Sequence, residues 1–230
     1  MDEDLDMTKV SFNAFLHVAN TYQLLDAGSA LGSNCGPLLI SKKEFKPEEI
    51  AGLDIGIPGK YTTAAFLLKF AYPEATNTVE FHFNKIEKKI LKDVVDAGVI
   101  IHETRFTYQD KGLLKIADLG EVWEQKTGFP IPLGGIVIKK DMPEELKQKL
   151  ARIMKRSVEF ALTNPLSSAD FVKEHAFEID DEVIHKHILL YVNDYTRSLG
   201  AKGKEAVNYL FEYALQNKLI SHIPENIFFE

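Results

Sequence analysis

Three chemically active side chains follow an apolar segment in "GVIIHETRFTY", residues 98–108. The apolar segment is typical of a strand buried on both faces, and His102, Glu103 and Arg105 come where that strand should emerge. A histidine has an ordinary pKa of about 6.5, so it can accept or donate a proton near neutral pH. We therefore take His102 as the candidate general base, with a hydrogen-bonded structural histidine as the alternative.

A helix start provides the second candidate feature, in "IGIPGKYTTAAFLLKF", residues 55–70. The pattern predicts a strand, a glycine turn and a helix that either Thr62 or Thr63 caps. Backbone N–H groups around Thr63 and Ala64, together with the helix dipole, can hold a carboxylate, although threonine can also serve as a simple cap. Because this helix follows a strand, its N-terminus faces the carboxyl edge of the sheet. If the strands are parallel, the end of "GVIIHE" lies there too.

Other polar segments carry weaker signals. "TKVSFNAF" places Ser11 and Asn13 on one face of a predicted strand, opposite Phe12, as part of either a polar cleft wall or a half-solvated strand. "GSALGSNCGPLLIS" predicts a tight loop and lacks the nucleotide-binding glycine patterns. Cys35 is the only cysteine, which excludes an intrachain disulfide or a paired-cysteine zinc site and leaves covalent catalysis with little support.

No metal site is predicted either. His185 and His187 are two residues apart, which on a helix points them in different directions rather than toward one ion.

The elements that must position these residues alternate between strands and helices. We expect strands within 8–14, 36–43, 53–59, 78–83, 98–103 and 131–140, and helices within 15–28, 61–73, 85–98 and 120–128. Gly28 is a plausible end of the first helix, and the chain is almost wholly helical after Met142. This order predicts an α/β architecture with mostly parallel sheets and a helical C-terminal region.

The same order predicts two α/β lobes around a ligand-binding cleft. Residues 1–51 form the first part of lobe 1, residues 52–133 an inserted lobe 2, and residues 134–230 the return strand and C-terminal helices of lobe 1. Clefts between domains are common sites for small molecules, so we expect a small-molecule substrate.

Composition excludes several classes of partner. The net charge of -7 is spread along the chain, and no basic stripe of the kind that binds nucleic acid is present. No apolar run approaches the ~20 residues that span a bilayer, and the acidic opening MDEDLDM is unlike a signal peptide. We therefore expect the chain not to bind membranes. A single cysteine is compatible with a reducing compartment, so we expect the chain to be cytoplasmic.

Five blocks together resemble the 1,4-dihydroxy-6-naphthoate synthase family of the futalosine route to menaquinone. They are "TKVSFNAF", "GSALGSNCGPLLIS", "IAGLDIGIPGKYTTAAFLL", the long block at residues 97–136, and "DEVIHKHILLYVNDYTRSLG". The resemblance implies a periplasmic-binding-protein type II fold. It also implies a carbon-carbon lyase that acts on cyclic dehypoxanthinyl futalosine without a metal or other cofactor.

Site roles follow from the same resemblance. His102 matches the proposed catalytic base of the family, and Ser11, Thr62, Thr63 and Ala64 match residues that line its ligand cleft. Asn13 lies on the predicted face of Ser11. Arg105 is expected either to contact the substrate or to form an ion pair with Glu103 or another acid.

One departure from the family concerns the start of the chain. Its members begin with a further strand-loop-helix region that supplies a central strand, so we expect either that this sequence is a truncated gene model or fragment, or that the activity is compromised. The sheet edge exposed without that region would also invite pairing with another chain, as in a homodimer. Two alternatives remain. One is a solute-binding protein of a transporter, which shares the fold. The other is the sister family, chorismate dehydratase, against which the "IIHE" histidine argues.

Overall fold

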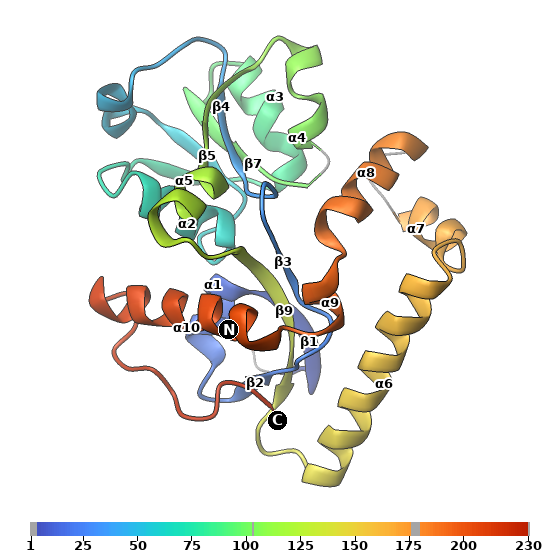
Figure 1. Cartoon of the computed structure of the whole chain (residues 1–230). Coiled ribbons are helices and arrows are strands. Elements are labelled where there is room, and N and C mark those ends of the chain that lie inside the picture. The colour runs from blue at the N-terminus through green and yellow to red at the C-terminus, as the bar shows by residue number, and fades with distance from the viewer. Residues whose placement is uncertain (1–3, 103, 176–179, 230) are drawn as a thin grey trace. The chain divides into compact units, whose positions relative to one another are not determined.

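The computed structural model describes residues 4–102, 104–175 and 180–229, and the chain divides into two compact units (Figure 1). Unit 1 combines Met1–Gly32 with Pro132–Glu230, and unit 2 is the uninterrupted stretch Ser33–Ile131. The first boundary therefore lies before strand β4 (Leu38–Ser41) and not after residue 51, because β4 pairs with strands of unit 2.

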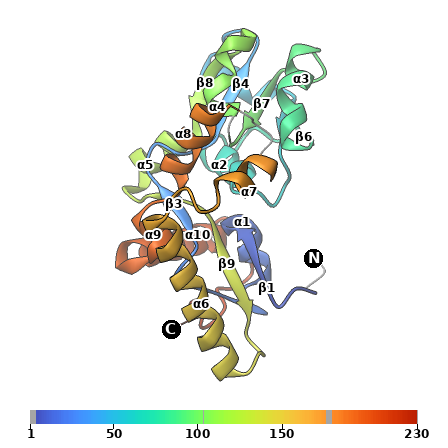
Figure 2. The same ribbon diagram turned by 90° about the vertical axis from the view of Figure 1, so that its right-hand side faces the viewer.

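Unit 2 contains a five-stranded mixed sheet in the order β6-β5-β7-β4-β8. Figure 2 labels β8, β4, β7 and β6 of this sheet. The bounds of the other four strands are β5 Ile55–Ile57, β6 Thr78–Glu80, β7 Ala97–Ile100 and β8 Leu114–Asp118. Strand β5 is parallel to β6 and to β7, whereas β4 is antiparallel to β7 and to β8. The prediction of mostly parallel sheets is wrong: in this sheet only the pairs that β5 forms with β6 and β7 are parallel, because β4 runs in the opposite direction to both of its neighbours.

Helices and short 3-10 turns surround this sheet. Their bounds are η1 Pro47–Gly52, α2 Thr63–Ala71, η2 Phe83–Lys85, α3 Ile86–Leu91, α4 Thr104–Thr107, η3 Gln109–Lys111 and α5 Leu119–Thr127. The predicted helix over 85–98 ends early, and Asp93 just beyond it takes a left-handed φ of +55°.

Two apolar clusters fix the layers of unit 2. Buried isoleucines of β4, α3 and β7 share one cluster, with Phe81 packed against it. On α5, the fully buried Trp123 lies 4.9 Å from Phe70 and 6.1 Å from Phe66 of α2, measured between ring centroids. Aromatic rings at these separations attract one another beyond their burial, which binds α2 to α5.

Unit 1 contains a four-stranded sheet built around β9 (Ile131–Lys139). Strands β1 (Met7–Ser11) and β2 (Tyr22–Leu24) pair with β9 in antiparallel fashion, and β3 (Ala30–Gly32) also pairs with it. The predicted helix over 15–28 is wrong in its bounds, since α1 runs Phe12–Val18 and the chain then returns as β2. Gly28 therefore ends no helix, and its φ of +93° belongs to the turn before β3.

The predicted helical C-terminal region is confirmed. It comprises α6 Glu144–Thr163, α7 Ala169–His175, α8 Asp181–Tyr191, α9 Asp194–Arg197 and α10 Gly200–Gln216. Helix α10 packs on α1 through an edge-to-face contact of Phe211 with Phe15 at 5.5 Å. In the described part of the chain, no helix combines the length and the apolar character needed to cross a membrane.

Candidate functional site

Chemically active residues of unit 2 gather at one edge of its sheet, which we call the carboxyl edge. The parallel register of β6, β5 and β7 makes these three strands end together. Because Leu38 pairs with both Ile100 and Asp118, the start of β4 and the end of β8 lie at this edge as well. The carboxyl edge of an α/β sheet is where such proteins bind ligands.

The start of α2 lies at this edge, directly after β5. Thr62 is the N-cap: its hydroxyl donates to the carbonyl oxygen of Gly59 at 2.7 Å and accepts from the N–H of Ala65 at 3.2 Å. Of the two caps left open by the sequence, the structure thus selects Thr62. Thr63 and Ala64 follow as the first two residues of the helix, and both are buried.

A carboxylate fixes the turn that precedes α2. Glu80, at the end of β6, accepts a hydrogen bond from the backbone N–H of Lys60 at 2.9 Å. Gly59 has a φ of +140°, which residues with a side chain rarely adopt. Glu80 and Gly59 together hold the backbone that delivers Thr62 to its capping position.

His102 lies two residues beyond the end of β7 and is exposed. Its ring centroid is 5.1 Å from that of Phe83, with the rings inclined by 66°. Its φ is +59°, a left-handed conformation that is uncommon for a residue with a side chain and is found most often where surrounding contacts enforce it. The predicted placement of a histidine at the emerging end of a strand is confirmed.

Arg105 is engaged with the protein itself. Its Nη2 lies 3.3 Å from Oδ2 of Asp118, and both side chains are largely buried. Its Nη1 donates to the carbonyl oxygen of Gly36. Of the two roles that the sequence left open, these contacts are those of an ion pair with another acid; Glu103, the first acid considered, lies outside the described residues.

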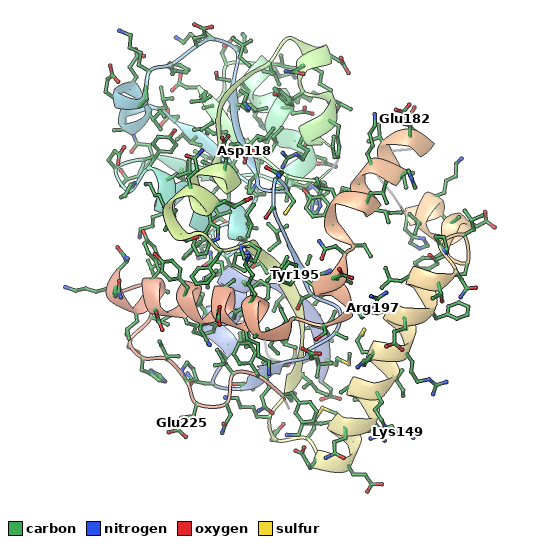
Figure 3. The ribbon with its side chains drawn as sticks, in the orientation of Figure 1. Asp118, Lys149, Glu182, Tyr195, Arg197 and Glu225 are labelled. Atoms are coloured by element: carbon green, nitrogen blue, oxygen red, sulfur yellow. The ribbon has the colours of Figure 1, made fainter. Side chains whose placement is uncertain are left out.

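Asp118 binds two partners at once. Oδ1 accepts from the N–H groups of Gly120 and Glu121 at 3.0 and 3.1 Å and thereby caps α5, while Oδ2 accepts from Arg105 at 3.3 Å. The side chain of Asp118 is labelled in unit 2 in Figure 3. A carboxylate at a helix N-terminus also interacts favourably with the helix dipole. Sequence reasoning missed Asp118, although an acid followed three residues later by Glu121 has the spacing of a capping box.

Cys35 and Gly36 lie in the loop that leads into β4. Burial raises the pKa of the Cys35 thiol to about 12, and nearby Arg105 opposes this rise only in part. A thiol that stays protonated is a poor nucleophile, which agrees with the prediction that covalent catalysis has little support.

Ser11 and Asn13 belong to unit 1, and their predicted arrangement is wrong. Ser11 ends β1 and caps α1, where its hydroxyl accepts from the N–H of Ala14 at 3.0 Å. Asn13 already lies within α1 and is buried, so the two residues do not share a strand face. The short alternating pattern spans a strand-to-helix junction. Their part in substrate binding stays a prediction.

Sequence reasoning also missed Phe83 and Glu80, because neither belongs to a recognisable motif. Among the described residues, no three histidine, cysteine, aspartate or glutamate side chains are grouped so that they could hold a metal ion.

Comparison with known proteins gives consistent matches over nearly the whole chain. A family model described as menaquinone biosynthesis matches residues 1–216. A 1,4-dihydroxy-6-naphthoate synthase from Thermus thermophilus is 39% identical over 224 residues, which cover 97% of this chain and 81% of the relative. A synthase of the same name from Streptomyces coelicolor is 36% identical over 222 residues, covering 94% and 78%.

Solved structures support the predicted fold class. The crystal structure of an Archaeoglobus fulgidus protein matches with a TM-score of 0.88 and 34% identity, covering 94% of this chain and 81% of its own. An alkanesulfonate-binding protein from Xanthomonas axonopodis, at 11% identity, has a TM-score of 0.68 and covers 96% and 78%. The latter likeness concerns the fold alone, and it confirms the expected binding-protein-like α/β architecture.

Proposed function

The chain belongs to the menaquinone biosynthesis family, and from that premise we propose that it is a 1,4-dihydroxy-6-naphthoate synthase. The observation that carries this proposal is the 39% and 36% identity to two proteins of that name over nearly the full chain. We propose cyclic dehypoxanthinyl futalosine as the substrate, the cytoplasm as the location, and a lyase reaction that needs neither a metal nor a redox cofactor.

In this proposal His102 is the general base. Its exposure and its position at the carboxyl edge of unit 2 support the role, because a base must reach the proton that it removes. Proton transfer to the imidazole from a hydroxyl or ring position of the sugar-derived part starts the reaction. The electrons left behind then help to break the bond that retains the sugar-derived fragment.

The start of α2 is the proposed seat of the substrate carboxylate. Thr62 caps the helix by accepting from the N–H of Ala65, and the backbone N–H groups of Thr63 and Ala64 in the first turn, together with the helix dipole, are the proposed donors to this carboxylate. A carboxylate held there fixes the substrate while His102 removes the proton. Holding two reacting groups in the right orientation accounts for a large part of the rate increase that enzymes achieve.

A transporter-type binding role is the second candidate, because the ligand-binding component of an import system from Staphylococcus aureus and the alkanesulfonate-binding protein share the fold, at 15% and 11% identity. The much higher identity to the two synthases favours catalysis.

Turnover measured by mass spectrometry tests the proposal. The purified protein is incubated with cyclic dehypoxanthinyl futalosine, or with chorismate as the competing substrate, in the presence and absence of EDTA. We expect naphthoate product from cyclic dehypoxanthinyl futalosine and none from chorismate. The rate of product formation should be the same with and without EDTA.

The base role is tested with His102→Gln, with Lys42→Gln as the control in an exposed ion pair of the same unit. His102→Gln should reduce kcat by about 10²–10⁴-fold, the usual contribution of a general base. Tight binding of the substrate by calorimetry without any turnover would instead support the binding role. Unchanged turnover in His102→Gln would exclude this histidine as the base.

A further inference from the structure

The segment that carries His102 is fastened to unit 2 through the side chain of Arg105. The backbone N–H of Arg105 donates to the carbonyl oxygen of His102 at 3.4 Å, and Thr104 Oγ1 donates to the carbonyl oxygen of Ile101 at 2.6 Å. These contacts link His102 to Arg105 and Ile101 to Thr104 directly after β7. The guanidinium of Arg105 then connects these residues to Asp118 and Gly36.

The ion pair and the hydrogen bond of Arg105 together join three structural elements at the carboxyl edge. Asp118 is at once the last residue of β8 and the N-cap of α5, and Gly36 lies just before β4. The side chains of Arg105 and Asp118 are only 13% and 12% exposed, so water competes weakly for their charges. A planar guanidinium can satisfy a carboxylate and a carbonyl oxygen in fixed directions, which a lysine ammonium does not reproduce.

The backbone of His102 supplies a reason for such fastening. Its φ of +59° is unfavourable for a histidine, and a free loop would relax from it. A conformation of this kind persists where the neighbouring structure determines it, and Arg105 supplies a buried anchor three residues away.

We propose that Arg105, held by Asp118, is a positioning residue for His102. This inference rests on the proposed function for its catalytic consequence. Arg105 keeps the imidazole in a productive orientation and makes no contact with the substrate itself. The role differs from direct substrate binding in a measurable way, because loss of orientation lowers kcat and loss of a ground-state contact raises KM.

The kinetic test compares Arg105→Lys and Arg105→Gln with Lys42→Gln. Lys42 forms an exposed ion pair with Asp93 in the same unit, so its loss controls for removal of a charge. We expect Arg105→Gln to lower kcat by about tenfold to a hundredfold, with KM within about threefold, since a displacement of about 1 Å can cost a hundredfold in rate. Arg105→Lys should recover part of this loss because it retains the positive charge. It also serves as the test variant if Arg105→Gln fails to fold.

A second readout needs no turnover. The imidazole ring signal of His102 is assigned by NMR as the signal that disappears in His102→Gln. It should shift or broaden in Arg105→Lys and in folded Arg105→Gln, and it should stay in place in Lys42→Gln.

The outcomes separate this inference from the proposed function. If the unsubstituted protein forms no product but the His102 signal moves in the Arg105 variants, positioning stands and the synthase proposal fails. If the unsubstituted protein is active and the Arg105 variants keep either its kcat or its His102 signal, the positioning role is refuted. A loss confined to KM would likewise refute it and assign Arg105 to substrate binding.

Discussion

Replacing Gly36 with alanine forces a methyl group into space that the backbone of α5 already occupies. A Cβ built at Gly36 would lie 2.4 Å from Cα and 2.6 Å from the nitrogen of Gly120. Ordinary contacts begin at 3.4 Å, so the two backbones would have to separate by about 1 Å. Because backbone atoms cannot rotate away as a side chain can, we expect the full cost of overpacking, about 3 kcal/mol.

Gly52 provides the matched control within the same unit. A Cβ there meets nothing within 4 Å, and its φ lies outside the left-handed region. Gly52→Ala should therefore stabilise unit 2 by about 0.4–1 kcal/mol, since alanine restricts the unfolded chain more than glycine does. The same chemical change thus has opposite predicted signs at the two positions.

Urea unfolding followed by tryptophan fluorescence measures both effects. Trp123 is the only tryptophan of the chain and is fully buried in unit 2, so its emission reports that unit. With a denaturant slope of about 2 kcal/mol per molar urea, the midpoint should fall by about 1.5 M in Gly36→Ala and rise by about 0.2–0.5 M in Gly52→Ala. Equal midpoints, or a Gly36→Ala protein as stable as the original, would refute the close contact between Gly36 and Gly120.

Three further changes test other parts of the carboxyl edge. Thr62→Ala should lower stability by about 1 kcal/mol through loss of the cap on Ala65, and Thr62→Ser should restore most of it; equal thermal midpoints for the two variants would contradict the capping role. Cys35, whose pKa burial raises from 9.0 to about 12, should resist a thiol reagent at pH 8 until urea unfolds the protein. Between pH 9 and about 12 the unfolded state loses this proton while the folded state keeps it, so the thiol's contribution should make unfolding easier as pH rises, and Cys35→Ser should weaken that dependence. Phe83→Leu should lower kcat about tenfold with little change in KM by removing the ring against His102, whereas an unchanged kcat would show that this contact does not orient the base.

Local signals allowed much of unit 2 to be predicted. The glycine turn, the threonine cap and the apolar spacing of α2 act within a few residues, and so does the helical pattern of α5. The region around α1 failed for the opposite reason. Tyr22 and Leu24 fit a helical pattern, but β2 forms because Leu24 pairs with Val137, which is more than a hundred residues away. No local window contains that partner.

The candidate site divides along the same line. His102 and Thr62 were identified because each follows a strand with a clear pattern. The choice between substrate contact and ion pair for Arg105 could not be made from sequence, because its partners Asp118 and Gly36 come together only through the β4 pairings. Phe83 reaches His102 across the sheet edge in the same non-local way.

The division of the chain also sets an order in time. Every strand of the unit 2 sheet is synthesised within one uninterrupted stretch, so this unit has its sheet partners once Ile131 has left the ribosome. The β1 and β2 strands of unit 1, made first, must wait for β9 before they can pair. The part of unit 1 that is synthesised before unit 2 therefore completes its fold last. Until β9 is made, the unpaired edges of β1 and β2 can pair with strands of other chains.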